Sequence, residues 1–391
     1  MGIIIERKNP MKDLEKKIRS YRRREWAKLI LTVVTIVSAV ISTYLLLEMQ
    51  TYSKMKVIER YDDVVTNSGS YREFSDEIIK YSRDGICLLG KTGQEKWNQS
   101  YQIKNPVVVM SKKAVAVAEQ EGNLIYVFDG NGMKGEIRTT APVEKFAVAD
   151  NGIVAAMLRS EEAVQIVCYD AVGNILVGHK TTMGGMGYPI GLALSPSGTK
   201  LAVTYLTTEA GSVATRVVFY DFSGDVSEEE GYQLSQEIYR DVVVPSVYFA
   251  SEEKAVLVGE SGYWSCRIKN KTVTSNLVEI DKEIMSVFWE DQTVGFVLKK
   301  AGEEGQEVRL YNLDGKQILS KRIKEEYSNV KLSEGNVILY DGKKACLISG
   351  WGVLEFEGEV DQNIMEIVTL SGINKYLVMN ADGMQEIRLV K

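Results

Sequence analysis

The chain carries few residues of the kinds that catalyse reactions or bind metals, and these residues are scattered. Among its 391 residues there is a single histidine, His179. One histidine cannot build a multi-histidine zinc site, and no serine or cysteine nucleophile motif accompanies it, so a catalytic triad is unsupported. We expect His179 to be a solvated residue at the end of a strand. The sequence predicts no catalytic residue, no metal site and no cofactor.

Carboxylate chemistry is the one catalytic class that the composition leaves open, because glycosidases need only two acids at a suitable distance. The candidate acids lie in one long repeat, at Glu209, Asp225 and 228–230. A solvated insertion explains them without catalysis. We therefore predict that the chain is not an enzyme, and we keep carboxylate-dependent carbohydrate-active or other hydrolytic activity as the alternative.

One loop is a candidate binding surface. Residues 182–189 read Thr-Met-Gly-Gly-Met-Gly-Tyr-Pro, without the lysine and following helix of a phosphate-binding loop. Flexible Gly and Met residues beside a tyrosine suit an adaptable contact surface, and plain turn chemistry is the alternative. The candidate contact residues are Met183, Met186 and Tyr188, together with Glu209 from a neighbouring loop.

These residues sit in a domain of short, repeated strands that begins near residue 71. A β-rich strand, a tight turn and a polar strand recur at spacings of about 37 to 51 residues. The copies begin at Cys87, Tyr126, Cys168, Phe219, Cys266, Leu310, Leu347 and Ile387. Four strands per period are typical of a propeller blade, whose faces are buried only in a closed ring. The sequence predicts an all-β propeller of eight blades, with seven as the alternative, and Tyr71–Phe74 as the strand that completes the last blade.

The four cysteines occupy the third strand of four different predicted blades, at Cys87, Cys168, Cys266 and Cys346. Equivalent strands of different blades lie farther apart than the roughly 7 Å between Cα atoms that a disulfide allows. We therefore predict four buried, unpaired thiols that serve as small packing residues.

A single apolar stretch, 29–47, separates a basic head from these repeats. Its length as a helix matches the roughly 30 Å hydrocarbon core of a bilayer. The head, 1–28, holds ten basic and four acidic residues, which places it in the cytoplasm and the rest of the chain across the membrane. A cleaved signal peptide is the alternative, but the stretch is longer than a signal core and no small-residue cleavage site follows it.

The predicted organisation has four parts: a basic segment (1–28), a transmembrane helix (29–47), a juxtamembrane stalk (48–70) and an extracytoplasmic propeller (71–391). Apolar residues at every third position from Met49 to Tyr61 predict a helical stalk. The head carries +6 and the whole chain −6, so the remainder carries −12. Such an acidic domain is a poor partner for nucleic acid.

The run Asp84–Trp97, which reads Asp-Gly-Ile-Cys-Leu-Leu-Gly-Lys-Thr-Gly-Gln-Glu-Lys-Trp, resembles the repeat of quinoprotein-like (PQQ-like) propellers. The whole layout resembles the domain-of-unknown-function 5711 family of Gram-positive bacteria. The resemblance implies a propeller held outside the cell and no settled activity. The adjacent disulfide and metal-binding residues of the quinone dehydrogenases have no evident match here, so their cofactor does not carry over.

These observations favour a single-pass protein of the cell membrane whose extracytoplasmic propeller is a binding or scaffold module. The expected partner, besides the membrane, is a protein or a cell-envelope polymer.

Overall fold

The computed structural model divides the chain into two compact units, 1–51 and 52–391, of which the first is helical and the second is built of strands. The residues that the structure describes are 10–61, 69–160, 163–181, 185–224, 226–227, 231–269 and 271–391.

The helical unit holds α1, which runs from Pro10 to Glu48. Its segment Tyr21–Thr43 is long and apolar enough to cross a membrane, and this property is shared by membrane anchors and signal sequences. Within it, the hydroxyls of Thr32 and Thr35 donate to carbonyls four residues earlier, which satisfies polar groups inside the apolar stretch.

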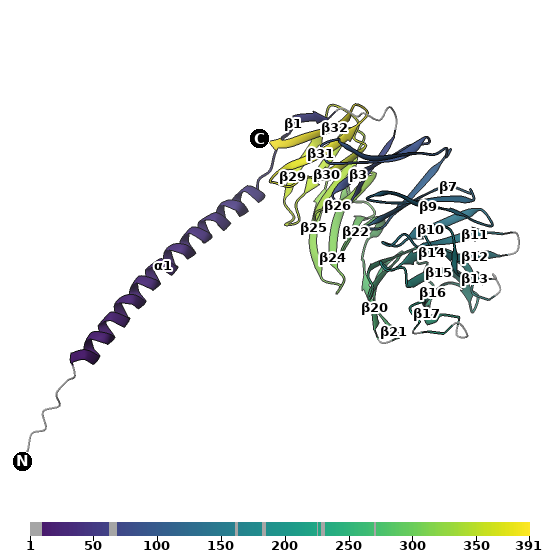
Figure 1. Cartoon of the computed structure of the whole chain (residues 1–391), viewed down its shortest axis with the longest axis horizontal. Coiled ribbons are helices and arrows are strands. Elements are labelled where there is room, and N and C mark those ends of the chain that lie inside the picture. The colour runs from purple at the N-terminus through teal and green to yellow at the C-terminus, as the bar shows by residue number, and fades with distance from the viewer. Residues whose placement is uncertain are drawn as a thin grey trace, which may run out of the picture. The chain divides into compact units, whose positions relative to one another are not determined.

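The second unit is an eight-bladed β-propeller, in which each blade is a four-stranded antiparallel sheet (Figure 1). Blades 1 to 7 follow the chain in order, from β2–β5 for blade 1 to β26–β29 for blade 7. Blade 8 has the order β30, β31, β32 and β1, so it joins two distant parts of the chain.

The bounds of the strands follow their position in the blade, from the channel outward. The innermost strands of blades 1 to 8 are β2 Ser70–Phe74, β6 Pro106–Met110, β10 Val143–Val148, β14 Tyr188–Leu194, β18 Ser246–Ser251, β22 Glu283–Glu290, β26 Asn329–Ser333 and β30 Glu366–Thr369. The second strands are β3 Glu77–Tyr81, β7 Ala114–Glu119, β11 Val154–Arg159, β15 Lys200–Glu209, β19 Lys254–Gly259, β23 Thr293–Lys299, β27 Asn336–Asp341 and β31 Lys375–Asn380. The third strands are β4 Gly85–Leu89, β8 Leu124–Asp129, β12 Val164–Tyr169, β16 Ser212–Asp221, β20 Gly262–Lys269, β24 Gln306–Asn312, β28 Lys344–Ile348 and β32 Gly383–Val390. The outermost strands are β5 Glu95–Ser100, β9 Gly132–Arg138, β13 Ile175–Thr181, β17 Gln233–Arg240, β21 Thr272–Glu279, β25 Gln317–Ile323, β29 Leu354–Glu359 and β1 Lys54–Tyr61.

The hydrophobic core lies between the blades rather than at a single centre. Each pair of neighbouring blades shares one cluster of buried apolar side chains, and these clusters run all the way around the ring. The cluster between blades 8 and 1, for example, contains Leu377, Met379, Ile78 and Leu89. Because each sheet buries both faces against its neighbours, the ring is closed by the hydrophobic effect.

The strand that completes blade 8 differs from the prediction. β1 pairs with β32 from Lys54 opposite Val390 to Tyr61 opposite Met384, so this part of the predicted helical stalk is a strand. The unpaired edge of β32 supplies backbone partners that a short isolated helix lacks. The segment Tyr71–Phe74, predicted to close the ring, instead belongs to β2 of blade 1. The propeller therefore includes 54–61.

All four cysteines are buried and form no disulfide, and each lies on the third strand of its blade as predicted. Burial raises the pKa of Cys168 and of Cys266 to about 12, which keeps both thiols protonated and unreactive. The cysteines are packing residues.

The antiparallel order gives the propeller two faces. The loop face carries the links between blades and the turns between second and third strands, such as Ala210–Gly211. The turn face carries the turns between first and second strands and between third and fourth strands, such as 349–353. The candidate site lies at the loop face.

Candidate functional site

A cavity of about 340 Å³ lies along the innermost strands of blades 2 to 5, toward the loop face. Its apolar lining comes from Val107, Val109, Val143, Phe146, Leu192 and Val247. Its polar lining comes from Glu119, Gln120, Glu144, Lys145 and Ser246. An apolar wall with a few polar groups is typical of a binding cavity. We call it the loop-face cavity.

Glu144 is the charged group of this cavity with the most partners. The hydroxyl of Tyr188, at the start of β14, donates to the Glu144 carboxylate and lies 2.7 Å from each of its oxygens. Arg159 Nε lies 3.6 Å from the same carboxylate, and Arg159 Nη1 lies 3.2 Å from Glu121. The hydrogen bond to Glu144 raises the pKa of Tyr188. Tyr188 is thereby fixed at the edge of the cavity as a neutral phenol.

A second cluster lies next to Tyr188 and is held together by Arg216 of β16. Its guanidinium donates to the carbonyl of Gly185 at 2.6 Å and forms an ion pair with Glu209 at 3.2 Å. It also lies 3.6 Å from the sulfur of Met186. Because the Arg216 side chain is only 14 % exposed, this cluster fixes the end of the loop before β14.

The structure thus brings together three of the four predicted contact residues. Met186 and Glu209 meet through Arg216, and Tyr188 faces Glu144 nearby. The fourth, Met183, lies outside the described residues.

Sequence reasoning missed Glu144, Arg159 and Arg216, which hold these residues in place. The available signal was a charged residue inside a β-branched strand, as in Thr215-Arg216-Val217. Such a residue has to find a partner when its strand is buried.

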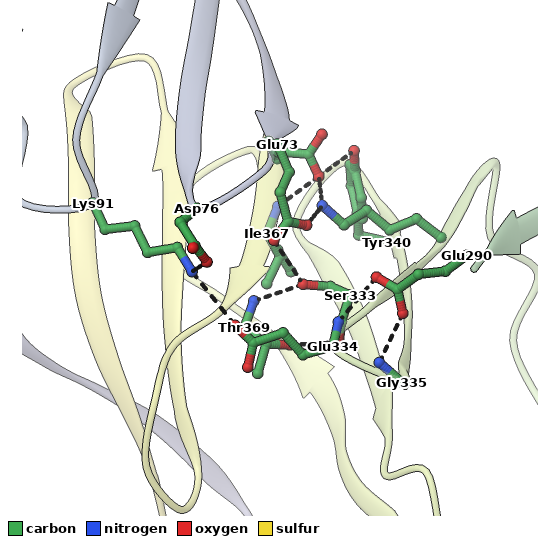
Figure 2. A network of polar contacts seen from close by, with 12 residues as sticks. Glu73, Asp76, Lys91, Glu290, Ser333, Glu334, Gly335, Tyr340, Ile367 and Thr369 are labelled. Atoms are coloured by element: carbon green, nitrogen blue, oxygen red, sulfur yellow. Dashed lines mark hydrogen bonds and ion pairs between the residues drawn. The ribbon is translucent and has the colours of Figure 1, made fainter. Parts of the chain in front are cut away.

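The opposite side of the channel, formed by blades 6 to 8 and blade 1, carries a network of charges (Figure 2). Lys331 of blade 7 lies 2.9 Å from Glu73 of blade 1 and 3.0 Å from Glu366 of blade 8. Burial lowers the pKa of Lys331, but the charges of Glu366 and Glu73 outweigh that effect and raise it. Ser333 donates to Glu73 and accepts the N–H of Thr369. This network links three blades at the point where the ring closes.

Glu290 extends the network into blade 6. Its carboxylate accepts the backbone N–H groups of Glu334 at 3.1 Å and Gly335 at 2.8 Å, as Figure 2 shows. Burial raises the pKa of Glu290, the two N–H groups lower it, and the negative charge of Glu73 adds to the increase. A carboxyl whose pKa is raised by burial is one feature of a general acid.

The other residues considered for catalysis do not form a site in the described part of the chain. Asp225 and 228–230 lie outside the described residues, and of His179 only the backbone, in β13, is described. In the described part of the chain, no group of three His, Cys, Asp or Glu side chains is arranged to hold a metal ion.

Three solved structures align with most of the chain at low sequence identity. A computationally designed protein, Ika8, aligns with a TM-score of 0.52 and 12% identity, over 87% of this chain and 100% of its own. Apo AztD from Citrobacter koseri aligns with a TM-score of 0.51 and 9% identity, over 76% of this chain and 88% of its own. BamB from Moraxella catarrhalis aligns with a TM-score of 0.49 and 9% identity, over 87% of this chain and 99% of its own.

These likenesses concern the fold alone. A search of curated proteins finds no significant match. A family model, described as a family of unknown function (DUF5711), matches residues 48–389, which include β1 and all eight blades. The chain belongs to the DUF5711 family.

Proposed function

We propose that the chain is a single-pass membrane protein whose propeller lies outside the cell and binds a protein or envelope polymer through its loop face. The observation that carries this proposal is the loop-face cavity. Beside it, Leu206, opposite Tyr188 in the sheet, is 37 % exposed, and Val213 is 49 % exposed. Exposed apolar groups next to fixed charges are features of an interaction surface.

The membrane part of the proposal rests on α1 and on charge. The helix exposes apolar side chains along its length, such as Leu31 and Val40, which only a lipid environment or a partner would cover. The basic residues that precede the apolar stretch favour a cytoplasmic N-terminus. Protease treatment of intact cells tests this orientation: the propeller should become digestible without permeabilisation, and protection of the propeller would contradict it.

Photo-crosslinking from single positions tests the binding face. A photoreactive amino acid at Leu206 or Val213 should capture a protein or a wall polymer in living cells. The matched control is Val172, 63 % exposed in a turn on the turn face. Equal capture from Val172, or no capture from the loop face, would contradict the proposal.

The second candidate function is hydrolysis by a carboxyl pair, and the raised pKa of Glu290 beside Glu73 favours it. Both groups are already engaged, Glu290 by two backbone amides and Glu73 by Lys331 and Ser333. The binding proposal therefore expects no hydrolysis of cell-wall polysaccharides. Release of reducing sugar by the wild type that is abolished by Glu290→Gln would establish the enzyme instead.

A further inference from the structure

The turn face has one strongly exposed aromatic side chain. Trp351 is 73 % exposed, more than any other large apolar side chain in the described part of the propeller. It sits in the turn between β28 and β29 of blade 7, where the N–H of Gly352 donates to the carbonyl of Ser349 at 2.8 Å. Gly352 has a φ of 81°, a conformation that suits glycine and makes this turn tight. The turn therefore presents Trp351 to the surroundings on a fixed support.

This turn adjoins the place where the chain enters the propeller. The N–H of Tyr52, the first residue of the strand-built unit, donates to the carbonyl of Glu355 at 2.7 Å. Glu355 follows Trp351 by four residues, so their Cα atoms are at most about 14 Å apart. The next N–H, of Ser53, donates to the carbonyl of Val390 at 3.0 Å. The incoming chain is thus fixed at the corner between blades 7 and 8.

Apolar and basic side chains surround this corner. The turn packs on blade 6, because the Cβ position of Gly352 is 3.6 Å from the Leu319 side chain. The preceding residue, Ile318, is 50 % exposed. Exposed lysines follow at the same ends of the strands, at Lys54, Lys316 and Lys391. Two exposed acids lie there as well: Asp314 pairs with Arg267 at 3.8 Å, and Glu334 pairs with Lys91 at 3.5 Å.

The chain between α1 and this corner is short. The helix ends at Glu48, so only residues 49–51 precede Tyr52, and the Cα atoms of Glu48 and Tyr52 are at most about 14 Å apart. Tryptophan prefers the boundary between hydrocarbon and water, and lysines are attracted to anionic headgroups.

We propose that the corner formed by Trp351, Ile318, Lys54 and Lys316 rests in the headgroup layer of an anionic bilayer. The turn face is then directed toward the membrane, and the loop face with its cavity is directed away from it. This inference rests on the proposed function in one respect, which is that α1 spans the membrane.

Quenching of tryptophan fluorescence by brominated lipid tests the contact. The full chain is reconstituted in vesicles of phosphatidylcholine and phosphatidylglycerol, with Trp26→Phe as the background so that the helix contributes no signal. Adding Trp351→Phe should remove more than half of the quenching. The matched control, Trp264→Phe, removes a tryptophan that is 8 % exposed near the loop-face end of β20 and should leave the quenching unchanged. Quenching that is insensitive to Trp351→Phe, or equally sensitive to Trp264→Phe, would overturn the proposal.

A third variant tests separately whether α1 inserts into the membrane and whether the corner contacts the headgroup layer. The single variant Trp351→Phe retains Trp26 of α1, whose quenching reports insertion of the helix. Quenching of Trp26 without quenching of Trp351 would leave the anchor intact and refute the corner contact. If neither Trp26 nor Trp351 is quenched, both the membrane insertion of α1 and the contact of the corner with lipid are refuted.

Discussion

The two sides of the propeller channel are built on the same strand order but differ in chemistry. The innermost strands of blades 2 to 5 present mainly valine, leucine and phenylalanine around the loop-face cavity. Those of blades 7, 8 and 1 are tied by Lys331, Glu73 and Glu366. Apolar contacts are non-directional, whereas a buried charge has to keep its partners. The side with the loop-face cavity therefore has the features of a binding surface. The side with the charged network connects the blades at which the ring closes.

The largest expected effect is on the charged side. Replacing Lys331 by Met removes the cation that pairs with both Glu73 and Glu366, so the free energy of unfolding should fall by about 3 kcal/mol. The midpoint of urea denaturation measures this loss. Adding Glu73→Gln and Glu366→Gln to Lys331→Met should restore most of the stability. An unchanged midpoint in Lys331→Met would show that the network contributes nothing.

A smaller loss is expected on the apolar side. Val143 is 2 % exposed in the wall of the cavity, and Val143→Ala should cost about 2 kcal/mol through lost burial and added void. The same denaturation at pH 5 and pH 8 should give equal losses, because no charge is involved. A loss that depends on pH would contradict the distinction between the two sides.

Acid sensitivity should follow a second charged cluster, in blade 6. Burial raises the pKa of Glu307, but hydrogen bonds from Arg309, Lys282 and Ser320 outweigh it and lower the pKa to about 2. The pKa of Glu307 in the folded protein lies below its value of about 4.3 in the unfolded chain. The ionised carboxylate therefore stabilises the folded protein above pH 4.3, and this stabilisation is lost as the pH falls toward 2.

Replacing Glu307 by Gln should cost about 1.5 kcal/mol at pH 7 and flatten the stability profile between pH 4.5 and 2. Thermal denaturation across this range measures the effect. A variant that keeps the steep acid dependence of the wild type would assign that dependence to other carboxyls.

The smallest effect on stability is expected at the candidate site itself. Tyr188→Phe removes one hydrogen bond to Glu144 in a partly exposed position, so it should cost less than about 1 kcal/mol. Crosslinking from Leu206 should nevertheless decrease, because the phenol no longer fixes the edge of the cavity. Unchanged crosslinking would remove Tyr188 from the contact surface.

Much of the fold was predictable because propeller blades are local. Each blade is a run of consecutive strands with tight turns, and repetition of the turn sequence exposes the period. The closing strand was not predictable in the same way. Residues 54–61 pair with a strand at the far end of the sequence, and the three-residue spacing of their apolar side chains resembled a helix.

The site was only partly predictable for a related reason. The loop around Met186 and Tyr188 stands out by its own composition. Glu144 and Arg216 lie on strands distant in sequence from that loop, and nothing in their local sequence indicates that the fold brings them into contact with it. The charged network has the same origin, since Lys331, Glu73 and Glu366 come from three blades and share no local pattern.

The composite blade has a consequence for biosynthesis. Tyr61 and Glu386, which meet across β1 and β32, are 325 residues apart, so a ribosome translates all seven other blades between them. At roughly 5 to 20 residues per second, β1 waits tens of seconds for its partner strand. A nascent chain that stops short of β32 leaves β1 unpaired and the ring open, with an apolar face exposed to proteases. Ring closure therefore requires that translation has run through the last blade.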